Sequence, residues 1–92
     1  VLADSDHEAI LYLIDENDTY NYVSFGQSIW SQLAHMIVSD QKAFLKVEDG
    51  LLELTDFTEE LKALLYNIEG NSNYGEAFVQ AIENTFADFF GK

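Results

Sequence analysis

The segment that decides the fold is Tyr66–Phe90, YNIEGNSNYGEAFVQAIENTFADFF, because it combines the most apolar helix of the chain with its most distinctive loop. The helical part carries one apolar stripe, whose members recur every four residues: Phe78, Ile82, Phe86 and Phe90. The opposite face of this helix is polar. The segments upstream must therefore supply a surface that buries the stripe.

Composition limits the possible fold and location. A chain of 92 residues is expected to form a single domain, residues 1–92, and a hydrophobic content of 48% is too high for a disordered polypeptide even at a net charge of -13. No run approaches the ~20 apolar residues of a membrane span. Residues 1–9 (VLADSDHEA) lack the features of a signal peptide, and we expect them to be a loosely ordered lead. We therefore expect a cytoplasmic protein that does not bind membranes.

The charge is strongly acidic, with 17 Asp and Glu against four basic residues. Because nucleic-acid binding requires Lys and Arg to neutralise phosphates, we expect no nucleic-acid partner. An acidic surface keeps a protein soluble, and it also suits a basic protein partner. One kind of acidic protein with a basic partner is a nucleic-acid mimic, which occupies the basic groove of another protein.

The first part of the chain predicts two strands. Ile10–Ile14 (ILYLI) is a short apolar run that is typical of a strand covered on both faces. Tyr20–Phe25 (YNYVSF) alternates, with its tyrosines on one side and Val23 and Phe25 on the other. Asp15–Thr19 (DENDT) favours a turn, leaves the register open, and lacks the glycine and distal glutamate of a calcium loop.

A helix is expected to follow and to run to about Ser39. Ser24 with Gln27 has the spacing of a capping box, and Ser28 is an alternative cap. The apolar stripe of this helix predicts that Trp30 anchors it in the core.

A second hairpin is predicted around Asp49-Gly50, because glycine accepts the positive φ that a two-residue type I′ loop requires. This loop would place Lys46 opposite Glu53 as a cross-strand ion pair. One face of the hairpin is then apolar and consists of Ala43, Leu45, Val47, Leu52 and Leu54.

Two more helices complete the prediction. Asp56 with Glu59 repeats the capping-box spacing, and Gly70 ends the helix that follows. Asn73 with Glu76 gives the same spacing at the start of the last helix. The expected fold is α+β, a small antiparallel sheet with helices on one face in the order ββαββαα.

Several of these residues resemble a known family. The similarity rests on residues 67–76 (NIEGNSNYGE), Thr85-Phe86, residues 1–6 (VLADSD) and residues 52–55 (LELT). Together they resemble the YjbL-like family, small acidic uncharacterised proteins of Firmicutes, and the loop GNSNYG is the most specific piece. The resemblance implies no activity, cofactor or partner. It does imply an additional N-terminal stretch, which is a candidate to cover part of the sheet.

Two surfaces are candidates for a protein partner or for self-association. Phe44 and Leu51 lie on the side of the second hairpin that a two-layer domain leaves in water. The other candidate is the loop before the last helix, with Asn71, Asn73, Tyr74 and Gly75, because such a loop presents backbone N–H groups to an anion. The structural interpretation of that loop is a cap at Asn73 and a Tyr74 that packs on the preceding helix.

No pattern predicts catalytic residues, a cofactor or a metal site. Asp4, Asp6 and His7 form an acidic terminal run that is more typical of a solvated segment than of a metal centre, and a lone helical histidine, His35, is more often structural than catalytic. The chain has no cysteine. We therefore expect a non-enzymatic interaction or regulatory module.

An enzyme is the alternative. A small hydrolase or metal-assisted enzyme would use paired carboxylates, such as Asp15 with Asp18 or Glu59 with Glu60. Such a pair must be delivered across a cleft in unlike environments, whereas adjacent acids usually form a solvated face.

Overall fold

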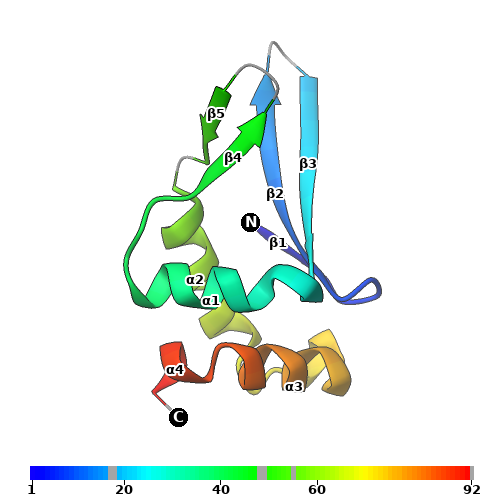
Figure 1. The fold of residues 1–92 in the computed structure, drawn as a ribbon. Coiled ribbons are helices and arrows are strands. Elements are labelled where there is room, and N and C mark those ends of the chain that lie inside the picture. The colour runs from blue at the N-terminus through cyan, green and yellow to red at the C-terminus, as the bar shows by residue number, and fades with distance from the viewer. Residues whose placement is uncertain (17–18, 48–49, 55, 92) are drawn as a thin grey trace.

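The strands form two antiparallel sheets in the computed structural model, which describes residues 1–16, 19–47, 50–54 and 56–91 (Figure 1). The first sheet has the order β1-β2-β3, with β1 at Leu2–Asp4, β2 at Ala9–Glu16 and β3 at Thr19–Gly26. The second is a hairpin of β4, Phe44–Val47, and β5, Gly50–Glu53.

The helices gather at the end of the strands where β3 leads into the first of them (Figure 1). A 3₁₀ turn, η1, at Gln27–Ile29 leads into α1, Trp30–Val38. After the second hairpin come α2, Phe57–Ile68, a 3₁₀ turn η2 at Ser72–Tyr74, α3 at Glu76–Thr85, and α4 at Ala87–Phe90. No helix in the described part of the chain is long and apolar enough to cross a membrane.

The predicted α+β class is confirmed, with two differences in the sheet. Leu2–Asp4 forms β1, within the segment expected to be a loose lead, and pairs with β2 so that Leu2 lies opposite Leu11. The predicted single sheet is wrong, because the second hairpin does not join the first sheet. β1 pairs with the backbone of β2 along Ala9–Leu11, so that stretch of β2 cannot pair with β4. The two hairpins contact each other through side chains of the core instead.

The core lies where the inner faces of both sheets meet the helices. Trp30 is fully buried, as predicted, and its Nε1 donates a hydrogen bond of 2.8 Å to the carbonyl oxygen of Phe25. The Trp30 ring also packs edge-on against Phe78 at 5.8 Å and lies 6.4 Å from Phe86. The stripe predicted in the last helix is therefore buried as far as Phe86, where φ of -101° and ψ of 25° break it into α3 and α4.

The first sheet is covered on its inner face only. Phe25 is buried and Val23 packs on the core, whereas Tyr20 and Tyr22 on the other side are exposed, as the alternation predicts. The prediction that the strand at residues 10–14 is covered on both faces is wrong, because Leu13 is 39% exposed. The helices gather at one end of the strands (Figure 1), and the outer side chains Leu2, Leu13, Tyr20 and Tyr22 are exposed.

The register of the second hairpin differs from the predicted one. Val47 pairs with Gly50 and Phe44 with Glu53, so Gly50 belongs to β5 and the connecting residues 48–49 lie outside the described part of the chain. Lys46 lies opposite Leu51, and Glu53 instead pairs with Lys42, with Nζ and Oε1 3.9 Å apart. The shift preserves the parity of the pairing, and Ala43, Leu52 and Leu54 contact the core as predicted. The side chains of Leu45 and Val47, which were predicted on the same face, lie outside the described part of the chain.

The predicted side-chain caps at the first two helices are wrong. Ser24 lies inside β3, which continues to Gly26. The N-cap position of α1 is Ile29, the last residue of η1, and its side chain has no oxygen that could cap the helix. Asp56 does occupy the N-cap position of α2, but its φ of 60° is left-handed and its side chain makes no capping bond. An N-cap aims its oxygen at the first-turn amides from the extended region, so a left-handed aspartate cannot reach them.

Tyr12 links the first sheet to α2, since its ring packs edge-on against Phe57 at 5.4 Å. Burial raises the pKa of Tyr12 above its usual value, and the charges of Glu60, Asp56 and Glu53 raise it further. The folded state therefore holds this proton more tightly than the unfolded chain. It follows that stability falls as the pH rises above ~10, where an unfolded tyrosine ionises.

We expect Tyr12 to ionise above the usual range of a tyrosine, because its pKa is raised. Absorbance of tyrosinate at alkaline pH should show a late step that Tyr12→Phe removes. A late step that persists in Tyr12→Phe would contradict the raised pKa of Tyr12.

Candidate functional site

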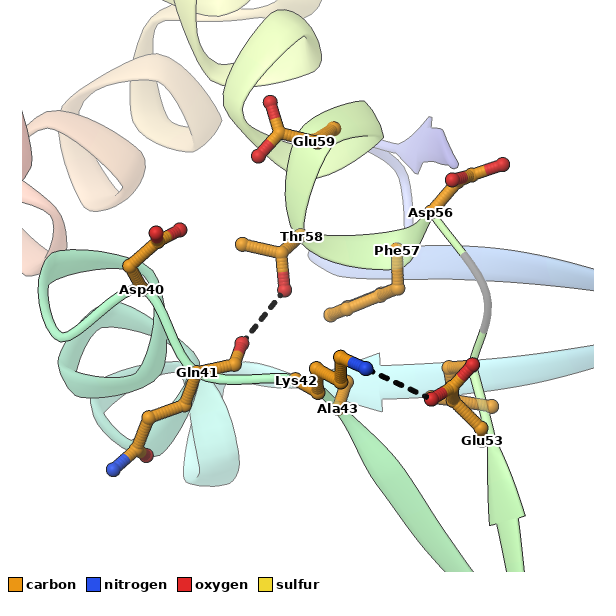
Figure 2. A pocket seen from close by; sticks show the side chains of 10 residues that line it. Asp40, Gln41, Lys42, Ala43, Glu53, Asp56, Phe57, Thr58 and Glu59 are labelled. Carbon is orange, nitrogen blue, oxygen red and sulfur yellow. Dashed lines mark hydrogen bonds and ion pairs between the residues drawn. The ribbon is translucent and has the colours of Figure 1, made fainter.

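A concavity lies where the connection from α1 to β4 runs beside the connection from β5 to α2 (Figure 2). The amide of Leu54 donates to the carbonyl of Ala43 at 2.9 Å, and Thr58 Oγ1 donates to the carbonyl of Gln41 at 3.1 Å. The resulting cleft has a volume of about 350 Å³. Its lining consists of Asp40, Gln41, Lys42, Ala43, Glu53, Leu54, Asp56, Phe57, Thr58 and Glu59.

Two aspartates give the cleft its shape. Asp40 follows α1 with φ of 56°, and Asp56 precedes α2 with φ of 60°. Aspartate tolerates this left-handed conformation better than most residues, so each can reverse the chain beside a helix end. The floor between them is apolar, formed by Ala43, Leu54 and Phe57, which are all buried.

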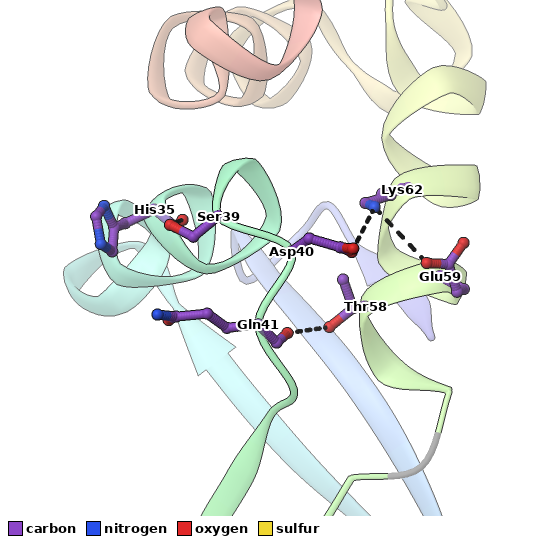
Figure 3. Close-up of polar contacts among 7 residues, drawn as sticks. All are labelled: His35, Ser39, Asp40, Gln41, Thr58, Glu59 and Lys62. Carbon is purple, nitrogen blue, oxygen red and sulfur yellow. Dashed lines mark hydrogen bonds and ion pairs between the residues drawn. The ribbon is translucent and has the colours of Figure 1, made fainter.

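The rim of the cleft is acidic, and Lys62 bridges it. Its Nζ lies 3.3 Å from Asp40 Oδ1 and 3.6 Å from Glu59 Oε1, which ties the end of α1 to α2 (Figure 3). Partial desolvation lowers the pKa of Lys62, but the hydrogen bond to Asp40 and the charge of Glu59 outweigh it, so the pKa lies above its usual value. The lysine is charged at neutral pH and screens two of the four carboxylates.

The loop predicted as a binding site is closed by its own hydrogen bonds. Asn71 Oδ1 accepts from the amide of Asn73 at 3.1 Å, and Gly75 donates its amide to Ser72 at 3.0 Å. The amide of Gly70 donates to Glu83 Oε2 at 2.8 Å. These three N–H groups are bonded within the chain, and the binding role of the loop stays a prediction.

The structural interpretation of this loop is supported in part. Tyr74 packs on α2, since its hydroxyl accepts from Asn67 Nδ2 at 2.8 Å. The predicted cap at Asn73 is wrong: the N-cap of α3 is Gly75, without a side-chain bond, and Asn71 caps η2 instead. Asn71 is the central residue, because its Nδ2 also donates to the carbonyl of Asn67 at 3.2 Å.

We expect Asn71→Ala to lower the free energy of unfolding by about 1 kcal/mol, since it removes an N-cap and a bond to α2. The matched change Asn73→Ala should cost no more than about 0.5 kcal/mol, because only the backbone amide of this exposed residue is bound. Urea unfolding followed by circular dichroism measures both. A larger cost at Asn73 would restore the capping role that the sequence predicted.

The apolar pair predicted on the second hairpin is exposed. Phe44 is 53% and Leu51 70% exposed, on the same face as Lys46 and Glu53. The observed register places Leu51 two residues from the position opposite Phe44, so the two side chains are diagonal neighbours within reach of each other. In the predicted register they stood two residues further apart.

The comparisons with known proteins place the chain in a family. A model described as a family of unknown function, UPF0738, matches residues 1–86. The chain belongs to the UPF0738 family. A UPF0738 protein of Lysinibacillus sphaericus is 43% identical over 86 residues, which cover 94% of this chain and 68% of the relative. A UPF0738 protein of Staphylococcus epidermidis is 44% identical over 86 residues, or 94% of this chain and 70% of the relative.

The expected resemblance to an uncharacterised family of Firmicutes is thereby confirmed, whereas the name YjbL-like stays a prediction. No function is assigned to the UPF0738 family. No solved structure matches the chain, so the geometry of this UPF0738 fold has to carry the functional argument.

The predicted acidic pair Glu59 and Glu60 of the UPF0738 chain does not converge. Glu59 pairs with Lys62, whereas Glu60 accepts a bond from the amino group of Val1, so these neighbours point in different directions. Asp15 and Asp18 lie outside the residues whose side chains are described. His7 Nδ1 lies 2.9 Å from Asp4 Oδ2 in an exposed turn, and no group of three or more His, Asp or Glu that could hold a metal occurs among the described residues.

Among the described residues that line the cleft, no nucleophile stands beside a base. Thr58 carries the only hydroxyl of these described residues, and it is bound to the carbonyl of Gln41. His35 lies on the far side of α1, turned away from Lys62 (Figure 3). Sequence reasoning missed the cleft, because its lining comes from two connections whose adjacency depends on tertiary packing.

Sequence reasoning also missed the outer face of the first sheet. Leu2 lies opposite Leu11, and Leu13 lies opposite Tyr22, all on the side away from the core. Leu2, Leu13, Tyr20 and Tyr22 are exposed. The alternating tyrosines were the available signal, but the continuous run at residues 10–14 concealed which of its side chains face outward.

Proposed function

We propose that this UPF0738 chain is a non-enzymatic interaction module that binds a protein through the outer face of its second hairpin. The observation that carries the proposal is the exposed pair Phe44 and Leu51. The pair is surrounded by charge, with Lys46 opposite Leu51 and Glu53 opposite Phe44. An apolar centre with a charged rim is the usual anatomy of a protein interface.

The fold explains why these side chains are not core residues. The other face of the same hairpin contributes Ala43 and Leu54 to the core, and Leu52 packs against it. Because successive side chains of a strand alternate, Phe44 and Leu51 cannot reach that core without a one-residue slip that would expose the buried set. Their apolar character therefore serves contacts outside this core.

The test replaces Phe44 with Lys and Leu51 with Glu, which leaves the net charge unchanged. Circular dichroism should show an intact fold, and the double variant should lose the partner that the parent protein retains from bacterial lysate. The matched control is Gln32→Lys with Asn84→Glu, at exposed polar positions of α1 and α3, which should bind like the parent.

Three results would overturn the proposal. Unfolding of the double variant would mean that Phe44 and Leu51 are buried in solution. A partner that the double variant retains but salt releases would assign binding to the acidic surface, as expected of a nucleic-acid mimic. Turnover of a substrate at the acidic cleft would favour an enzyme instead.

A further inference from the structure

The acidic cleft opens onto the outer face of the second hairpin. Glu53 lines the cleft and also stands directly opposite Phe44 in the pairing of β4 with β5. Directly opposed residues of an antiparallel pair have Cβ atoms about 5 Å apart. Leu51 lies two residues before Glu53 on the same face, or ~7 Å along the strand. The cleft and the exposed pair Phe44 and Leu51 therefore form one continuous surface.

Carboxylates outnumber basic groups around the cleft. The described lining carries one lysine, Lys42, and the carboxylates of Asp40, Glu53, Asp56 and Glu59 (Figure 2). Lys62 bridges two of these carboxylates from the rim, whereas Lys42 lies 3.9 Å from Glu53 with a side chain that is mostly exposed. The carboxylate of Asp56 makes no capping bond, and no ion pair joins it to another described residue. The cleft therefore keeps a surplus of negative charge.

The size and floor of the cleft suit one amphipathic side chain. Its volume of about 350 Å³ is at the small end of the ~300–1,000 Å³ range of ligand pockets, so it fits a side chain better than a nucleotide or an organic cofactor. The floor of Ala43, Leu54 and Phe57 is apolar, whereas the rim is acidic. A long basic side chain matches both, because its methylene groups pack on apolar atoms while its charged end stays at the rim.

We propose that the partner bound by the second hairpin presents an arginine side chain to this cleft, two residues away from an apolar side chain that packs on Phe44 and Leu51. This assignment rests on the proposed function, because it concerns the same hairpin, and it adds the chemical class of the bound segment. In an extended segment, side chains two residues apart lie on one side at ~7 Å, the spacing of Glu53 and Leu51.

Arginine fits the arrangement of the carboxylates. They stand around the cleft on several sides, and they come from both of its connections (Figure 2). A guanidinium group carries five N–H donors in a planar fork, so it can bond to more than one carboxylate at once, and it is more weakly hydrated than an ammonium group. The surplus of negative charge repels phosphates and other anions from the same place.

A second copy of the chain cannot be this partner. The chain contains no arginine, and its net charge of -13 repels another copy. The same charge attracts a basic segment and accelerates its encounter with the cleft. The partner is therefore a different protein with a basic and apolar segment.

A synthetic peptide tests this chemistry. The probe is the acetylated and amidated heptapeptide Ser-Leu-Thr-Arg-Thr-Leu-Ser, which carries a leucine two residues from the arginine on either side and so can bind in either direction. Titration at ~0.15 M salt, followed by the amide chemical shifts of the ¹⁵N-labelled protein, should give a Kd on the order of 1 mM. Amides of Phe44, Glu53 and Phe57 should shift. The same peptide with glutamine in place of arginine should bind at least about fivefold more weakly.

Asp56→Asn tests the cleft from the side of the protein. Asparagine tolerates the left-handed φ of 60° as aspartate does, so the change removes charge and preserves the connection. It should weaken the arginine peptide about three- to tenfold, with an unchanged circular dichroism spectrum. The matched control Asp6→Asn removes the same charge from the exposed turn between β1 and β2 and should bind within about twofold of the parent. Equal weakening in both variants would mean attraction by net charge alone, and would overturn the proposal.

The remaining outcomes separate the cleft from the hairpin. If Phe44→Lys with Leu51→Glu abolishes peptide binding while Asp56→Asn and the glutamine peptide have no effect, the hairpin is an interface and the assignment of arginine to the cleft is wrong. If Asp56→Asn weakens binding and the hairpin variant does not, the proposed function fails, and with it the apolar half of the recognised segment. No chemical-shift change at ~5 mM peptide would overturn the arginine site, whereas the proposed function would still be decided by capture of its partner.

Discussion

Replacing Phe57 with alanine is expected to lower the free energy of unfolding by about 3–5 kcal/mol, because its ring is almost completely buried. Phe57 begins α2, packs edge-on against Tyr12 of β2 at 5.4 Å, and packs at a tilt against Phe25 of β3 at 5.4 Å. It also forms part of the floor of the cleft. Phe57 therefore joins the first sheet, the connection from β5 and α2. A chain with a free energy of unfolding of ~5–10 kcal/mol would lose much of that stability.

Urea unfolding followed by circular dichroism measures this loss. The matched control is Phe44→Ala, which deletes the same ring from an exposed position and should cost less than about 1 kcal/mol. Equal losses at Phe44 and Phe57 would contradict the division of side chains between the faces of the second hairpin. The proposed interface would then be part of the core.

Most of the fold that could be predicted from the sequence was predicted from helical periodicity. The stripe at Phe78, Ile82 and Phe86 is buried, as is the stripe at Leu61 and Leu65 in α2. A helix buries every third or fourth residue against whatever lies beside it, so the pattern holds without knowledge of the partner element. Glycine at position 70 likewise ends α2 in the left-handed conformation that the sequence predicts, with φ of 67°.

The features that failed depend on contacts between elements that are distant in sequence. The spacing at Asp56 and Glu59 fits a capping box, but the connection from β5 forces Asp56 into a left-handed conformation that local spacing does not encode. The short β1 has no strand pattern of its own and exists because β2 offers an edge to Leu2–Asp4. The cleft is a third case, since its two connections meet only in the folded chain.

The candidate surfaces also differ in whether they could be predicted from the sequence. Alternation identified Phe44 and Leu51 as outward-facing even though the register was wrong, because a shift that preserves parity leaves each side chain on its face. The outer face of the first sheet was missed, since the continuous apolar run at residues 10–14 concealed which of its side chains face outward.

Replacing Trp30 with phenylalanine is expected to cost about 2–4 kcal/mol, the second largest loss that we predict. The indole N–H is the donor to the carbonyl of Phe25, the last buried residue of β3 before η1. Phenylalanine leaves that carbonyl without this donor and opens a cavity beside Phe78 and Phe86, which contact the indole ring. The junction between β3 and α1 should then become the weakest part of the fold.

Circular dichroism has to follow the unfolding, because Trp30 is the only tryptophan and its replacement removes the fluorescence signal. Phe78→Leu is the matched control, since it also shrinks a buried ring in the same cluster but breaks no hydrogen bond, and it should cost about 1–1.5 kcal/mol. The difference between the two variants measures what the indole hydrogen bond contributes. If Trp30→Phe costs no more than Phe78→Leu, the bond to Phe25 does not fix the end of β3.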